Sequence, residues 1–104
     1  MNIATREIII PKLRRYFATQ PIERVWLFGS FSRGEETETS DVDLLVDFNK
    51  AEIEDYFTNF FDLKYALQKL FGRNVDLVEE QTIKNPYLKL SIDASKTLVY
   101  GYSN

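Results

Sequence analysis

The chain has 104 residues, with 13 Lys and Arg against 16 Asp and Glu, a formal net charge of −3, and neither His nor Cys. The missing Cys excludes disulfides, thiolate nucleophiles and Cys-ligated metal sites, and the missing His excludes a Ser-His-Asp triad and His-ligated metals. Acid–base or metal chemistry must therefore use carboxylates, Lys, Tyr or the backbone, and hard oxygen ligands favour Mg²⁺, Mn²⁺ or Ca²⁺ over Zn²⁺. The excess of acidic residues argues against general, direct binding of nucleic acid, and leaves open only a local basic patch such as Lys12, Arg14 and Arg15.

The length predicts one domain, spanning 1–104, with a single core. Hydrophobic residues make up 44% of the chain and aromatic residues 14%, which is typical of a packed globule. No apolar run approaches the roughly 18 residues of a membrane span, and no basic segment followed by an apolar one opens the chain. We therefore expect a cytoplasmic protein without membrane contact.

The first half of the chain predicts a helix, a strand, a polar turn and a second strand. Apolar residues recur at helical spacing over 5–18, where Pro11 either lies in the first turn, after extended residues, or kinks a longer helix. Residues 24–28 are typical of a short buried strand that ends at a glycine. Residues 30–40 are polar and predict a helical turn and an exposed loop, and a second strand follows over 41–48.

The second half predicts a helix, a strand, a helix and a terminal extended segment. Apolar residues spaced three and four apart indicate a helix closed by Gly72, and they are Ile53, Phe57, Phe60, Leu63, Leu67 and Leu70. Residues 75–78 predict a third strand, Asn85-Pro86 predicts the cap and first residue of a last helix that reaches Ala94, and 98–100 are extended. This order predicts an α/β (α+β) fold with a small sheet flanked by helices.

Three aspartates are candidates for metal and acid–base chemistry. Side chains two apart on a strand point to the same side, so Asp41 and Asp43 project together, with Cα atoms about 6.5 Å apart. Their repulsion, about 2.5 kcal/mol at an effective dielectric of roughly 20, would be relieved by a divalent cation. Asp76 can join them if the third strand lies beside the second, and three carboxylates around two metal ions suit an in-line nucleotidyl displacement. Taken singly, each is an ordinary surface residue, and Asp47 shares their face but is expected at the far end of the strand.

A Gly-Ser pair follows the first predicted strand. Gly29 allows backbone amides to approach a phosphate, and Ser30 adds a hydroxyl donor. Arg33 could pair with a phosphate through its planar guanidinium, or could simply be solvated. Glu35 and Glu36 occupy the positions where a P-loop needs Lys and Ser/Thr, which excludes a Walker A motif.

Together these motifs resemble the minimal nucleotidyltransferase family of the DNA polymerase β-like nucleotidyltransferase superfamily. The segments that carry the resemblance are Phe28-Gly29-Ser30-Phe31-Ser32-Arg33-Gly34-Glu35, Ser40-Asp41-Val42-Asp43-Leu44-Leu45-Val46 and Val75-Asp76-Leu77. The Gly-Ser pair, the ten-residue gap, the Asp-x-Asp and the later Asp match in order and spacing over nearly the whole chain. Ser32 departs from the Ala of many members, which is a small-for-small change.

The resemblance implies a nucleotidyltransferase fold, a mixed sheet with helices packed mainly on one face. It also implies transfer of a nucleoside monophosphate from ATP, with Mg²⁺, to a hydroxyl. By similarity, Gly29 and Ser30, with Arg33 nearby, would bind the nucleotide, and Asp41, Asp43 and Asp76 would be the catalytic, metal-binding carboxylates.

The resemblance further implies a partner. Such short proteins are similar to antitoxins encoded beside a HEPN-domain ribonuclease, and the family includes members that transfer AMP to a tyrosine of that toxin. The HEPN nuclease signature requires a His, so the resemblance assigns this chain to the transferase side, and its length leaves no room for an added acceptor-binding domain. Two alternatives remain open: a binding module that neutralises the toxin by covering it, with Tyr87, Tyr100 and Tyr102 as candidate contacts, and a small-molecule nucleotidyltransferase that works as a homodimer.

Overall fold

The computed structural model describes residues 3–102, with side chains from residue 8 onward. In chain order the elements are α1 (Ile3–Phe17), β1 (Ile22–Phe28), α2 (Gly29–Arg33), β2 (Val42–Phe48), the 3₁₀ turn η1 (Lys50–Glu52), α3 (Tyr56–Phe71), β3 (Val75–Glu79), the 3₁₀ turn η2 (Glu80–Thr82), α4 (Pro86–Ser95) and β4 (Thr97–Tyr100). The predicted order of elements is confirmed, and the terminal extended segment is a strand of the sheet.

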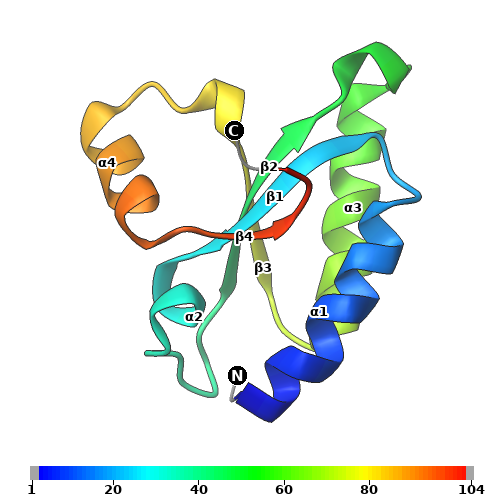
Figure 1. The fold of residues 1–104 in the computed structure, drawn as a ribbon. Coiled ribbons are helices and arrows are strands. Elements are labelled where there is room, and N and C mark those ends of the chain that lie inside the picture. Colours follow the sequence, from blue (N-terminus) through cyan, green and yellow to red (C-terminus); the bar gives the residue numbers. More distant parts are fainter. Residues whose placement is uncertain (1–2, 103–104) are drawn as a thin grey trace.

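The four strands form one mixed sheet in the order β3-β2-β1-β4. β1 is antiparallel to both β2 and β4, whereas β2 and β3 are parallel, as expected when a helix connects them. α1 and α3 lie side by side against one face of the sheet, and α4 lies on the other (Figure 1). The predicted mixed sheet with helices mainly on one face is confirmed.

The two faces of the sheet bury very different amounts of apolar surface. Alternate side chains of the strands point toward α1 and α3 and form the main core with side chains such as Phe17, Leu63 and Leu67. On the opposite face the cluster of buried hydrophobic side chains consists of Trp26, Leu45 and Ile92. On β2, the residues that face the α4 side include Asp43 and Asp47, which alternate with Leu44 and Val46 of the main core.

Local signals explain where the later helices begin and end. The Asp55 side chain accepts the backbone N–H of Thr58 at the start of α3, and Gly72 closes that helix at φ +65°. Asn85 caps α4 by accepting the backbone N–H groups of Tyr87 and Leu88, and Pro86 occupies the first helical position as predicted. Among residues 3–102, no helix is both long and apolar enough to cross a membrane.

The structure corrects three details of the predicted elements. Pro11 lies inside α1, so the longer helix is right and the version with extended residues before Pro11 is wrong. β2 begins at Val42 and not at Asp41, because pairing with β3 starts there. Ile53 precedes α3, which begins after the Asp55 cap, and Phe57 of the predicted apolar stripe is 72% exposed.

Candidate active site

Gly29 brings the start of α2 against the second strand. It directly follows β1 and has φ +72°, a backbone conformation that favours glycine. A Cβ added at Gly29 would overlap Oδ2 of Asp43 and lie 3.1 Å from its Cγ. The missing side chain thus allows a close approach between the Gly-Ser turn and the Asp43 carboxylate, two groups that the sequence separates by a polar loop.

The three candidate carboxylates lie at the same end of the sheet, where β2 and β3 begin. Asp43 and Asp76 are directly opposite each other in the parallel pairing of β2 and β3, and Asp41 lies just before β2. Burial raises the pKa of Asp43, and the negative charges of Asp76 and Asp41 raise it further, while Arg33 acts in the opposite direction. The predicted condition for Asp76 to join the pair, a third strand beside the second, is met.

The three candidate carboxylates can be compared with the ligands that a divalent cation requires. Carboxylate oxygens are the ligands that Mg²⁺ prefers, and Asp43 is half-buried beside two further acids, so a cation there would relieve their repulsion. Among the described residues, however, no three Asp, Glu, His or Cys side chains are gathered closely enough to hold a metal ion. The residues fit the chemistry of a hard cation, although their side chains are not arranged as a ready-made cage.

The candidate phosphate-binding residues lie on α2. Ser30 is half-buried, and its carbonyl accepts the backbone N–H of Glu35 at 2.9 Å where Gly34, at φ +72°, ends the helix. Arg33 is exposed and its Nε donates to Oε2 of Glu35 at 3.1 Å. The structure therefore places Ser30 and Arg33 beside Gly29, with the Arg33 guanidinium paired to its neighbour on the surface.

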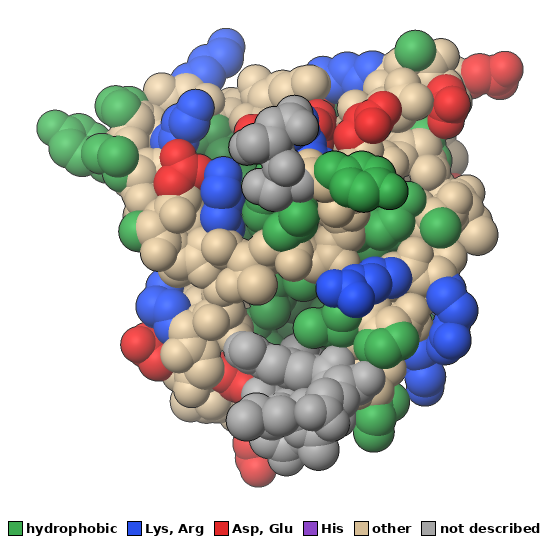
Figure 2. Space-filling view, in the orientation of Figure 1, with side chains coloured by type: hydrophobic (Ala, Val, Ile, Leu, Met, Phe, Trp, Pro, Cys, Tyr) green, Lys and Arg blue, Asp and Glu red, His purple; other side chains and the backbone are tan. Residues whose placement is uncertain are grey.

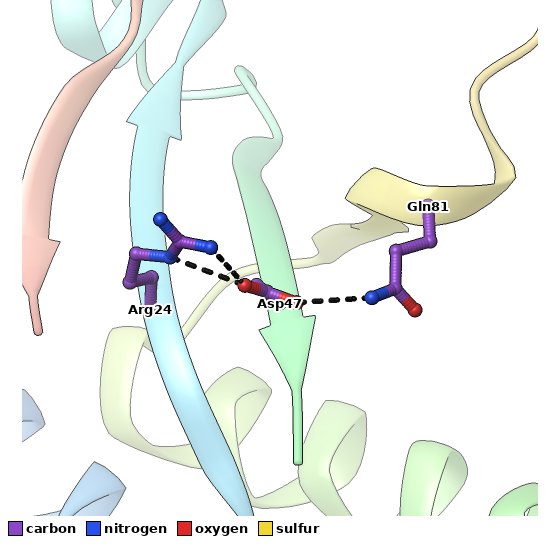
Figure 3. Close-up of polar contacts among 3 residues, drawn as sticks. All are labelled: Arg24, Asp47 and Gln81. Atoms are coloured by element: carbon purple, nitrogen blue, oxygen red, sulfur yellow. Dashed lines mark hydrogen bonds and ion pairs between the residues drawn. The ribbon is translucent and has the colours of Figure 1, made fainter. Parts of the chain in front are cut away.

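Asp47 shares the face of Asp43 but has a different role. It is 6% exposed, and its Oδ2 forms an ion pair with Arg24 of β1 at 2.6 Å (Figure 3). The side-chain amide of Gln81, in η2, lies 3.4 Å from its other oxygen. Asp47 therefore joins β1 and β2 to the turn after β3, and it takes no part in the carboxylate group.

Two side chains near the site, those of Ser32 and Arg73, make contacts that no pattern in the sequence reveals. The Ser32 hydroxyl donates to the carbonyl of Ser95 and lies 2.9 Å from the Thr97 hydroxyl, which ties α2 to the junction of α4 and β4. Arg73 donates to two carbonyls of the loop before Asp41. Both contacts join segments distant in the chain, so local spacing could not have revealed them.

Comparison with known proteins identifies the family of this chain. Residues 8–99 match the family model described as Nucleotidyltransferase domain. A Methanocaldococcus jannaschii protein named "Putative protein adenylyltransferase MJ0128" is 46% identical over 79 residues, which are 76% of each chain. "Protein adenylyltransferase MntA" of Thermococcus cleftensis is 41% identical over 68 residues, 65% of this chain and 66% of that protein.

Solved structures agree in fold. One named "Structure of putative minimal nucleotidyltransferase" is 33% identical, with a TM-score of 0.75, and the match covers 93% of this chain and 95% of the other. A toxin–antitoxin structure with AMP-PNP has a TM-score of 0.72 at 22% identity and covers 90% and 74% of the two chains. A complex of tri-AMPylated Shewanella oneidensis HEPN toxin with MNT antitoxin has a TM-score of 0.66 at 19% identity and covers 93% and 73%. The two complexes show the fold alone, and the matches above 30% identity show that the chain belongs to the nucleotidyltransferase domain family, as a minimal nucleotidyltransferase.

Proposed function

We propose that this chain is a Mg²⁺-dependent protein adenylyltransferase that transfers AMP from ATP to a tyrosine hydroxyl of a HEPN-domain toxin and so acts as an antitoxin. The observation that carries the proposal is the contact of Gly29 with Asp43, in register with Asp76, because it unites a phosphate-binding turn with acidic groups. The adenylyltransferase names of relatives and the toxin–antitoxin complexes among the structural neighbours support the nature of the donor and acceptor.

The proposal assigns a role to each candidate residue. Gly29, Ser30 and Arg33 would bind the triphosphate of ATP, and Arg33 would exchange Glu35 for a phosphate oxygen. Asp41, Asp43 and Asp76 would hold two Mg²⁺ ions, which when bound activate the acceptor hydroxyl and stabilise the leaving pyrophosphate. The oxygen of the acceptor forms a bond to the α-phosphorus as the bond to pyrophosphate breaks. Asp76 would be a third ligand or the base that accepts the hydroxyl proton.

The experiment that tests this function uses ATP labelled at the α-phosphate. The purified protein is incubated with labelled ATP, Mg²⁺ and the product of the neighbouring gene, and labelled tyrosine is sought in that product. We expect transfer by the native chain and a loss of about 10³-fold or more when Asp41→Asn and Asp43→Asn are combined, because the metal contribution is worth several kcal/mol. No transfer by the intact, folded chain would contradict the proposal.

A purely steric antitoxin is the alternative that exposed tyrosines favour. Tyr87 is 81% and Tyr102 88% exposed, whereas Tyr100 packs on Phe17 with ring centroids 5.7 Å apart. If this surface neutralised a toxin merely by covering it, the Asp41→Asn, Asp43→Asn double variant would still protect cells that express the toxin. Under the catalytic proposal the same variant fails to protect while still binding the toxin.

A further inference from the structure

A polar loop separates the two halves of the candidate site. Residues 35–40 connect the end of α2 to Asp41, and most of them are exposed. Within the loop, the Thr37 backbone N–H donates to the Ser40 hydroxyl at 2.8 Å, and the Ser40 N–H donates to the Thr37 carbonyl at 3.2 Å. These contacts close a local turn, but they do not fix that turn relative to the sheet.

A side chain from outside the loop contributes to its position. Nη1 of Arg73 donates to the Thr37 carbonyl at 2.6 Å and to the Ser40 carbonyl at 3.1 Å. Its guanidinium carbon lies 5.0 Å from the ring centroid of Phe31, the buried residue of α2. Arg73 stands between Gly72, which ends α3, and β3. A single guanidinium thus joins the loop to α2 and to the start of the strand that carries Asp76.

Arg73 and its neighbour hold the backbone on both sides of Asp41. The carbonyl of Ser40, just before Asp41, accepts from Arg73, and the N–H of Val42, just after it, donates to the Asn74 carbonyl at 3.0 Å. Asp41 itself is exposed and outside the strand. Its position relative to Asp43 therefore depends on these two anchors and not on packing of its own side chain.

We propose that Arg73 is a positioning residue that holds the loop 35–40 and Asp41 in place for nucleotide and metal binding. This inference rests on the proposed function for its ligand, but its structural half is independent of it. The planar guanidinium can donate to two carbonyls while stacking on a ring, which a lysine ammonium does less well. Arg73 itself touches neither the three aspartates nor the Gly-Ser turn in any contact that the structure shows.

The test compares Arg73→Met with a matched control, Arg24→Met. Arg24 also makes two side-chain hydrogen bonds and a ring contact, to Asp47 and Trp26, but it lies away from the loop. We expect faster backbone hydrogen exchange of residues 37–42 in Arg73→Met alone, measured in the ligand-free protein. Binding of Mg²⁺ with AMP-PNP, measured by calorimetry, should weaken by about tenfold to a hundredfold in the same variant. Arg73→Lys should recover part of both effects.

Two results would show that Arg73 does not position the loop. If hydrogen exchange of residues 37–42 is unchanged in Arg73→Met, or if the affinity loss is as large in Arg24→Met, then Arg73 contributes only to general stability and the inference is wrong. Should Arg73→Met fail to fold, Arg73→Lys is compared with Arg24→Lys by the same two measurements. A native chain that binds no Mg²⁺ and AMP-PNP overturns the proposed function, while hydrogen exchange still decides whether Arg73 holds the loop.

Discussion

Two aspartates on the same face of β2 have opposite electrostatic surroundings. Asp43 is half-buried beside Asp76 and Asp41, and its pKa is raised above the ordinary value of 3.8 chiefly by burial. Asp47 is more deeply buried but forms an ion pair with Arg24. A carboxylate whose negative charge is destabilised by its surroundings suggests a ligand site. A carboxylate whose charge is balanced by an ion pair suggests a structural contact.

The two single variants Asp43→Asn and Asp47→Asn should therefore change the free energy of unfolding in opposite directions. We expect Asp43→Asn to raise the free energy of unfolding at pH 7 by roughly 1 kcal/mol, because it removes repulsion in a partly exposed group. Asp47→Asn should lower it by about 1–3 kcal/mol, because Arg24 loses its charged partner. Chemical denaturation of both variants beside the native chain measures the difference, and a destabilised Asp43→Asn would contradict the electrostatic interpretation.

The gain from Asp43→Asn should depend on pH in a defined direction. Because the pKa of Asp43 is higher in the folded state than the ordinary 3.8, the folded state binds the proton more tightly over the interval between the two pKa values. The contribution of Asp43 to stability therefore falls as the pH rises through that interval, and its penalty is complete above the interval. The stability that Asp43→Asn gains over the native chain should be complete at about pH 7 and should vanish below the ordinary pKa of 3.8. Thermal unfolding of both proteins, at one pH in each range, measures this difference.

Among the elements, α1 and α4 use proline in opposite ways. Pro11 lies inside α1, where it lacks the N–H that would bond the preceding turn, whereas Pro86 is the first residue of α4, where that N–H has no helical partner. Pro11→Ala should raise the free energy of unfolding by about 1–3 kcal/mol, and Pro86→Ala should leave it unchanged or lower it slightly. Equal effects in thermal unfolding would show that Pro11 is not an interior helical residue.

The boundaries of the helices show which parts of the fold the sequence alone predicts. Caps and breakers such as Gly72 and Asn85-Pro86 are local, and they placed the ends of helices correctly. The start of α3 was misjudged because Ile53 continues an apolar spacing that the Asp55 cap interrupts. The spacing of apolar residues says nothing about which helix faces solvent, so the exposure of Phe57 was also missed.

The candidate site was predictable only in part for the same reason. Asp41 and Asp43 are two residues apart, so the sequence alone predicts that they lie close together, even though Asp41 lies outside β2. The place of Asp76 required knowing that β3 pairs with β2. The role of Arg73 depends on contacts across more than thirty residues of chain, to Thr37 and Ser40. Pairings of this kind are set by the packing of the whole molecule, and no local pattern encodes them.

At the scale of the whole molecule, the helices on the two faces of the sheet are attached to it by different numbers of buried hydrophobic side chains. The hydrophobic cluster toward α1 and α3 contains fifteen buried side chains among the described residues, whereas the hydrophobic cluster on the other face contains three, Trp26, Leu45 and Ile92. Ile92 is the one buried residue of α4, and hydrophobic side chains project from the surface over that helix (Figure 2). α4 is therefore expected to open at a lower free energy than the rest of the fold.

A pair of cavity-forming variants tests this inequality, with the single tryptophan as the reporter. Trp26 lies in the small cluster with Ile92, so its fluorescence follows the attachment of α4, while far-UV circular dichroism follows helical structure as a whole. In Ile92→Ala, the fluorescence change should occur at lower urea than the dichroism change, because α4 detaches before the main core unfolds. In Leu67→Ala, within α3, both changes should move together, with a loss of about 2–5 kcal/mol. Coincident transitions in Ile92→Ala would mean that α4 stays attached until the main core unfolds, and they would contradict the expected difference between the two faces.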